Sequence, residues 1–170
     1  YLELKTVEDV AEAVCALRVR GAPAIGIAAA MGTALSASNF RGGSVDELRN
    51  RVEEDIAVLA KTRPTAVNLF WALDRMKKVL AGDASRADEL AENLIAEAES
   101  IFQEDRELCR RLGRSGAELL KDGDTVLTHC NAGGLATGDY GTALGVIYAA
   151  AEAGKTINVY ADENRPLLQG

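Results

Sequence analysis

Apolar residues over the first 120 positions recur at the three- and four-residue spacing of amphipathic helices. The pattern predicts a first helix that begins after Thr6, a plausible N-cap, and ends near Arg18, because Gly21 and Pro23 break the repeat. A second helix is predicted to begin with Pro23 at its first position. Residues 24–37 are apolar or small on all sides, which predicts that this helix is buried.

Three longer helices are expected to follow. Ser44 and Glu47 form a capping box for the third, Thr65 can cap the fourth, and the fifth begins at Ser85. Their apolar stripes are, in order, Leu48, Val52, Ile56 and Leu59; Leu69, Leu73, Met76 and Leu80; and Leu90, Leu94, Ile101, Leu108, Leu112 and Leu119.

The pattern changes near Asp122. Two short β-branched runs, residues 124–128 and 156–160, flank an apolar helical run after Thr142, which predicts a βαβ unit with parallel strands. The expected fold class is therefore α/β, with a helical N-terminal domain at residues 1–121 and the first βαβ unit of a parallel sheet at residues 122–170. Two parallel strands do not make a stable sheet, so we expect the sheet to be truncated and the chain to be a piece of a longer protein.

Composition narrows the function classes. A net charge of −7 argues against a nucleic-acid partner, because phosphate neutralisation needs a basic face. Three widely spaced cysteines indicate free thiols in a reducing compartment. With one histidine, they lack the ligand spacing of a metal site. No apolar run reaches the roughly 20 residues that span a bilayer, and no signal peptide opens the chain, so we expect a cytoplasmic protein without a membrane partner.

Two arginines stand just ahead of prolines and helix starts. Arg20 precedes Gly21, Ala22 and the predicted start of the buried helix, where unpaired amides and the helix dipole favour an anion. Arg63 repeats the pattern before Pro64. A phosphate or carboxylate site is chemically sensible here, and a tight turn with a solvent-facing arginine is the alternative.

A cysteine and several glycines fill the loop from Thr128 to Gly141. Cys130 follows a predicted strand, where active-site groups of α/β sheets collect, and a nearby helix N-terminus would favour its thiolate. The alternative is a small buried hydrophobe, the role we expect for Cys15 and Cys109. Adjacent strand residues point to opposite faces, so His129 is assigned a structural or supporting role.

A dinucleotide site is disfavoured in the same loop. The glycines from Gly133 onward do not match G-x-G-x-x-G, and Asp162 comes late for a ribose contact. We therefore expect no nicotinamide and no other cofactor.

Five sequence segments, taken together, are similar to those of a known protein family. They are VRGAPAIG at 19–26, RPTAVN at 63–68, THCNAG at 128–133, LATGDYGTALG at 135–145 and RPLLQG at 165–170. In this order they resemble the methylthioribose-1-phosphate isomerase family, which also includes ribose-1,5-bisphosphate isomerases and the regulatory subunits of initiation factor 2B. One departure is Asn164, where the family usually has threonine in Asp-Glu-Thr-Arg-Pro.

The resemblance implies a Rossmann-like C-terminal domain, with the site between it and the helical domain. It implies an aldose–ketose isomerase of methionine salvage that acts on a sugar phosphate and forms a homodimer. It implies that Cys130 is the catalytic residue. It also implies that the substrate is bound by Arg20, Gly21, Ala22, Arg63 and Gln169. The family's general acid is an aspartate beyond residue 170, so residues 1–170 alone are expected to be inactive.

Two alternatives stay open. The substrate could be ribose 1,5-bisphosphate, or the protein could be a non-catalytic regulatory subunit that acts through protein contacts. Cys130 favours an isomerase over the regulator.

Overall fold

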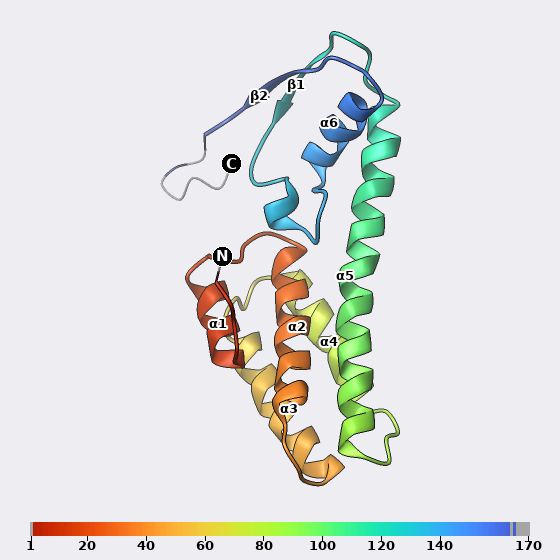
Figure 1. Cartoon of the computed structure of the whole chain (residues 1–170). Coiled ribbons are helices and arrows are strands. Elements are labelled where there is room, and N and C mark those ends of the chain that lie inside the picture. Colours follow the sequence, from red (N-terminus) through yellow and green to blue (C-terminus); the bar gives the residue numbers. More distant parts are fainter. Residues whose placement is uncertain (1, 164, 166–170) are drawn as a thin grey trace. The chain divides into compact units, whose positions relative to one another are not determined.

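Residues 2–163 and residue 165 are described by a computed structural model, shown in Figure 1. The fold is mostly helical, with a two-stranded parallel sheet. The elements are α1 (Val7–Cys15), α2 (Ala24–Asn39), α3 (Val45–Ala60), α4 (Val67–Leu80), α5 (Ala87–Ala117), β1 (Thr125–Thr128), the 3-10 helix η1 (Gly134–Ala136), α6 (Ala143–Glu152) and β2 (Asn158–Ala161). Residues 1–102 and 103–170 form two compact units, and α5 contributes to both.

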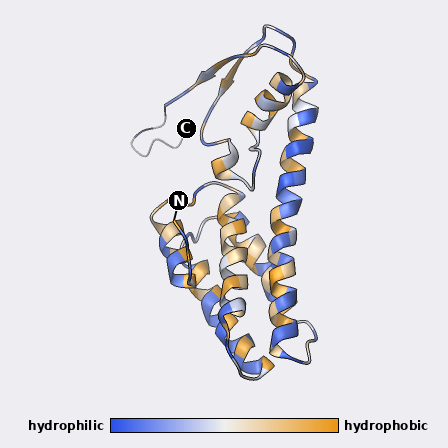
Figure 2. Cartoon of the chain, in the orientation of Figure 1, coloured by the Kyte–Doolittle hydropathy of each residue, from blue (hydrophilic) through white to orange (hydrophobic). Residues whose placement is uncertain are grey.

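Helix α2 is the core of the first unit, as its all-round apolar sequence predicted. Its residues from Ala24 to Ala37 are largely buried, and α1, α3 and α4 all contact it. In Figure 2 the ribbon of α2 is pale to orange along most of its length, whereas α5 alternates between blue and orange. At Gly32 an added Cβ would lie 3.2 Å from the side chain of Val10, so a small residue lets α1 pack closely here.

The caps of α1 and α3 are as predicted. Thr6 accepts a hydrogen bond from the amide of Asp9, whose carboxylate accepts from the amide of Thr6, and Ser44 and Glu47 make the same reciprocal pair. Such boxes satisfy amides that the helix leaves without partners.

Two predicted helix starts differ from the structure. Pro23 is the N-cap of α2 rather than its first residue. Thr65 does not cap α4, which begins at Val67 after Ala66. The reason is a turn in which the amide of Ala66 donates to the carbonyl of Arg63 at 3.0 Å, so Thr65 lies inside the turn.

Helix α1 ends at Cys15, earlier than predicted. Leu17 has a left-handed backbone with φ +60°. The amide of Arg18 donates to the carbonyl of Ala13, and the amide of Leu17 donates to that of Val14. This is the Schellman ending, which usually carries glycine at the left-handed position. Because this position is leucine here, the sequence pattern did not indicate that α1 ends at Cys15.

Core truncation gives a first stability prediction. Leu73 is 1% exposed on α4, so Leu73→Ala should lower the free energy of unfolding by about 2–5 kcal/mol through lost burial and a residual cavity. Val58 on α3 is 39% exposed, and Val58→Ala should change it by less than about 0.5 kcal/mol. Denaturant unfolding of both variants measures the contrast, and equal losses would contradict the assigned core.

The second unit contains the predicted βαβ unit. Strands β1 and β2 pair in parallel, with Thr125 opposite Asn158 and Thr128 opposite Ala161. Helix α6 packs against α5 through glycines, because a Cβ on Gly113 would lie 2.8 Å from the carbonyl oxygen of Gly145. Ala117, Ala149 and Ala150 form the small buried cluster of this unit.

The predicted leucine stripe of α5 is wrong in its later part. Leu90, Leu94 and Ile101 are buried, but Leu108, Leu112 and Leu119 are 51%, 40% and 83% exposed. The buried stripe continues instead through smaller residues, namely Asp105, Cys109 and Ala117. Close packing of α6 excludes leucines from this stripe. Among the described residues, no helix is long and apolar enough to cross a membrane.

Candidate functional site

The two arginine turns lie side by side in the first unit. Arg20 is in the turn between α1 and α2, and Arg63 is in the turn between α3 and α4. The thiol of Cys15 donates to the carbonyl of Thr62 at 3.8 Å. On the other side of the turns, the amide of Gly26 donates to Oδ1 of Asn68 at 2.9 Å. Each contact joins one end of the first turn to one end of the second, and both arginines are partly buried.

The start of α2 offers fewer amide donors than expected. The amide of Ile25 donates to the carbonyl of Gly21 at 3.0 Å, and that of Gly26 is taken by Asn68. The expectation that the first amides of this helix are unpaired is wrong for these two. Gly21 has φ +99°, a backbone conformation that favours glycine. The predicted anion site therefore rests on Arg20 with the amides of Gly21 and Ala22.

Asn68 is a residue whose role the sequence did not reveal. Its side chain closes the start of α2, and a Cβ on Gly26 would collide with it. The two motifs that contain Gly26 and Asn68 are thus parts of one local structure. The available signal was only that both motifs place an arginine ahead of a proline and a helix.

Cys130 lies directly beyond the C-terminal end of β1. Its side chain is exposed and its backbone is left-handed, with φ +66°. The buried-hydrophobe alternative is therefore wrong for Cys130. It holds for Cys109, which is 2% exposed and whose pKa is raised by burial, but it is also wrong for Cys15, which is exposed.

The loop that carries Cys130 folds back on itself. The amide of Thr142 donates to the carbonyl of Ala132 at 2.9 Å, and the amide of Gly141 donates to Oγ1 of Thr137 at 3.0 Å. Gly141 has φ +88°, and a Cβ there would lie 2.8 Å from the carbonyl oxygen of Ala132. These contacts hold both ends of the glycine-rich stretch together.

Helix α5 anchors this loop. The buried carboxylate of Asp105 accepts a hydrogen bond from the amide of Gly138 at 2.6 Å and from the thiol of Cys109. Asp139 forms ion pairs with Arg110 at 3.0 Å and Arg106 at 3.4 Å, and the Arg110 hydrogen bond is the main reason that its pKa is lowered. The loop is therefore tied to the helix at two consecutive residues.

The two ties should differ in strength. Asp105→Ala leaves the partly buried amide of Gly138 without its acceptor, so the free energy of unfolding should fall by about 1–3 kcal/mol. Asp139→Ala breaks exposed ion pairs and should lower it by less than about 1 kcal/mol. Denaturant unfolding of the two variants tests this order, and a larger loss for Asp139→Ala would reverse it.

A histidine–aspartate pair joins the ends of the two strands. Nδ1 of His129 lies 2.5 Å from Oδ2 of Asp162, and both side chains are partly exposed to solvent. Each residue directly follows its strand, and parallel strands end at the same edge of a sheet. Sequence reasoning gave His129 a supporting role but missed this partner, although the shared edge was the available signal.

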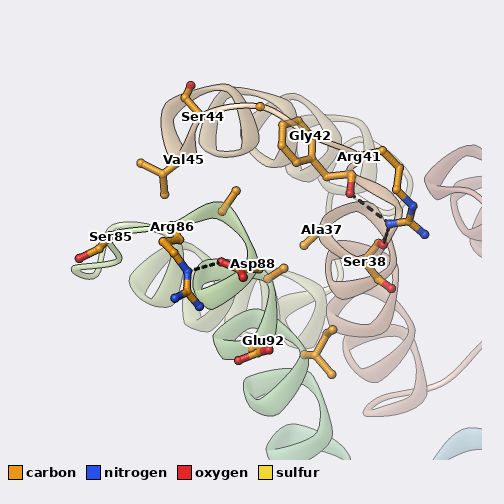
Figure 3. A pocket seen from close by; sticks show the side chains of 15 residues that line it. Ala37, Ser38, Arg41, Gly42, Ser44, Val45, Ser85, Arg86, Asp88 and Glu92 are labelled. Carbon is orange, nitrogen blue, oxygen red and sulfur yellow. Dashed lines mark hydrogen bonds and ion pairs between the residues drawn. The ribbon is translucent and has the colours of Figure 1, made fainter.

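A pocket in the first unit lies away from these residues. Its volume is about 800 Å³, and it is lined by the end of α2, the start of α3 and the start of α5 (Figure 3). Arg41 donates to the backbone carbonyls of Ser38 and Phe40, and Arg86 pairs with Asp88. The arginine turns are at the opposite end of α2, so this pocket includes none of the predicted site residues.

The structure brings the predicted residues together in two groups. Arg20, Gly21 and Ala22 are near Arg63 in the first unit. In the second unit Cys130 follows His129, which pairs with Asp162. Gln169 lies outside the described residues. Within residues 2–163 and 165, no group of three or more His, Cys, Asp or Glu residues could hold a metal ion.

Comparisons with known proteins give a consistent family. The profile of the initiation factor 2 subunit family matches residues 18–170. Curated relatives include the methylthioribose-1-phosphate isomerases of Thermotoga neapolitana, 56% identical over 170 residues, and Geobacter metallireducens, 56% identical over 171. Each alignment covers 100% of this chain and 48% or 49% of the relative. The chain therefore spans about half the length of the curated relatives that it matches.

Solved structures with similar folds have names from two functional classes. The 5-methylthioribose 1-phosphate isomerase of Pyrococcus horikoshii is 44% identical, with a TM-score of 0.88 over 97% of this chain and 46% of that one. A protein of A. fulgidus described as translation initiation factor eIF-2B, subunit delta, is 49% identical, with a TM-score of 0.89 over 99% and 49%. The eIF2B-beta2-delta2 complex of C. thermophilum, at 18% identity and a TM-score of 0.72, is similar in fold alone.

Proposed function

Because the chain belongs to the initiation factor 2 subunit family, we propose that the complete protein is a sugar-phosphate isomerase. The reaction converts 5-methylthioribose 1-phosphate into 5-methylthioribulose 1-phosphate, a step of methionine salvage. Identity of 56% over the whole chain to relatives named for this activity supports the substrate. The observation that carries the enzyme class is the exposed Cys130 at the end of β1, where active sites of α/β sheets form.

The proposal includes a larger architecture. The helical domain, residues 1–121, ends where strands and helices begin to alternate, although the compact units divide within α5. Residues 122–170 would begin a Rossmann-like domain. Leu127 and Tyr160 are 74% and 68% exposed, and further strands and helices would cover them, since parallel sheets are buried on both faces. The complete protein would act as a cytoplasmic homodimer.

Phosphate recognition belongs to the arginine turns. Arg20 and the amides of Gly21 and Ala22 would hold the phosphate, and Arg63 would supply a second positive charge from the neighbouring turn. Guanidinium groups match phosphate oxygens in charge and geometry. The contacts at Cys15 and Asn68 keep the two turns together, which supports a shared anion site. Gln169 would bind the substrate as well.

The reaction needs two proton-handling groups. Phosphate on the anomeric oxygen blocks a free aldehyde, so an acid must assist ring opening before hydrogen moves from C2 to C1. Cys130 would face the C1–C2 edge. By resemblance to the isomerase family, the acid would be an aspartate beyond residue 170. Asp139 does not match its position and is instead paired with Arg106 and Arg110.

A non-catalytic regulatory subunit is the second candidate. The name of the A. fulgidus protein, at 49% identity, favours it. An aspartate in the equivalent place of the downstream sequence would support the isomerase, and its absence would support the regulator.

Turnover of two substrates by the complete protein tests the proposal. We expect a higher kcat/KM for 5-methylthioribose 1-phosphate than for ribose 1,5-bisphosphate. The opposite order would reassign the protein to the ribose-1,5-bisphosphate isomerases, and turnover of neither would favour the regulatory subunit.

A further inference from the structure

The hydroxyl group of Thr128 stands apart from the other buried polar groups. Among the described residues, Thr128 Oγ1 is the buried side-chain oxygen or nitrogen that has no hydrogen-bond partner. Native proteins pair nearly all such atoms, so an exception calls for a physical reason. The backbone of Thr128 belongs to the sheet, since the residue lies opposite Ala161 of β2 and its carbonyl accepts from the amide of Asp162 at 3.4 Å.

The position of this hydroxyl group points to the site. Thr128 is the last residue of β1, and Cys130 follows two residues later. Along β1, Leu127 is 74% exposed whereas Thr128 is 9% exposed, so Thr128 is on the covered face of the sheet. The left-handed backbone of Cys130, unfavourable for a residue with a Cβ, lies two residues further along the chain. An unmet hydrogen bond and a strained residue therefore occur within three positions of the chain.

Thr137 shows how the same side chain is used for structure. It is also 9% exposed, and its hydroxyl group accepts a hydrogen bond from the amide of Gly141. Thr128 has no such role, and valine would fill nearly the same space in a strand without leaving a polar atom unpaired. Packing alone therefore does not account for threonine at this position.

We propose that Thr128 is a substrate-binding residue whose hydroxyl group forms a hydrogen bond with a hydroxyl group of the bound sugar phosphate. This inference rests on the proposed isomerase function. Protein covers Oγ1, so the segment from His129 to Asn131 shifts when substrate enters. The left-handed backbone at Cys130 favours such a shift, because a non-glycine residue is relieved of strain when it leaves that conformation.

The test uses three variants of the complete protein. Thr128→Val removes the hydroxyl group, Thr128→Ser restores it, and Thr137→Val is the matched control. For Thr128→Val we expect kcat/KM for 5-methylthioribose 1-phosphate to fall about tenfold, the loss of one hydrogen bond, with Tm unchanged or raised. Thr128→Ser should stay within about threefold of the parent kcat/KM. Thr137→Val should lower Tm, because the amide of Gly141 loses its acceptor.

The outcomes separate the two proposals. Parent kcat/KM in Thr128→Val would overturn the inference while leaving the isomerase intact. A lower Tm or failure to fold in Thr128→Val would also overturn it, because the hydroxyl group would then be used without substrate. No turnover by the parent protein would overturn the isomerase proposal and the role of Thr128 with it.

Discussion

Cys130→Ser in the complete protein should lower kcat by about 10²–10⁴ and leave KM little changed. A well-placed acid or base is worth that factor, and serine keeps the size of the side chain while holding its proton far more tightly. Cys130 is exposed at the end of β1, in a loop that Asp105 and Asp139 anchor to α5. The substitution therefore changes the chemistry of the site more than its shape.

Cys15→Ser is the matched control for this variant. Cys15 is the other exposed thiol, and it lies in the first unit with its hydrogen bond to Thr62. Its substitution should leave kcat within about twofold of the parent, because the hydroxyl group of serine can still donate to the carbonyl of Thr62 and keep the two turns joined. Near-parent turnover in Cys130→Ser would remove Cys130 from the mechanism.

Arg20→Ala should raise KM by about 10- to 100-fold with a smaller effect on kcat. Hydrogen bonds to charged groups contribute about 1.5–3 kcal/mol, which corresponds to that range. Arg20 is partly buried in the turn that the contacts at Cys15 and Gly26 hold against the Arg63 turn. Removal of one of two guanidinium groups would leave the other phosphate contacts in place, so binding weakens without being abolished.

Arg18→Ala controls for charge and for the turn. Arg18 is two residues away, exposed, and paired with Glu12 at 3.0 Å, an interaction that raises its pKa. This variant should leave KM within about twofold, since exposed ion pairs contribute little. Steady-state kinetics on both variants measures the difference. An unchanged KM in Arg20→Ala would exclude Arg20 from the phosphate site.

Sequence periodicity predicted the α-helices, the two strands and the burial of α2, but not the 3-10 helix η1. Its errors have local physical causes. Leu17 has a left-handed conformation at the end of α1, a position that is usually glycine. Because the residue here is leucine, the sequence pattern did not indicate where α1 ends. Leu108 and Leu112 fit the helical period but are exposed. Because α6 approaches α5 closely at Gly113, only smaller residues fit on the buried face of α5 there.

The sequence was sufficient to propose the residues of the candidate site, but it predicted only part of how they are arranged in space. Arg20, Arg63 and Cys130 follow from the chemistry of helix starts and strand ends. The contact between Gly26 and Asn68 and the pair of His129 with Asp162 join residues 42 and 33 positions apart. Such contacts depend on how the elements pack against one another, and this packing cannot be read from the local pattern of a single sequence. The unpaired hydroxyl group of Thr128 likewise becomes visible only when its surroundings are known.

Conversion of 5-methylthioribose 1-phosphate by the complete protein tests the central claim most directly. The sugar phosphate is incubated with the parent protein and with Cys130→Ser, and formation of the ketose 1-phosphate is followed over time. The proposed function predicts conversion by the parent and at least a hundredfold slower conversion by the variant, at the lower limit of about 10² for loss of a placed acid or base. Absence of ketose from the parent reaction, or equal rates for both proteins, would contradict it.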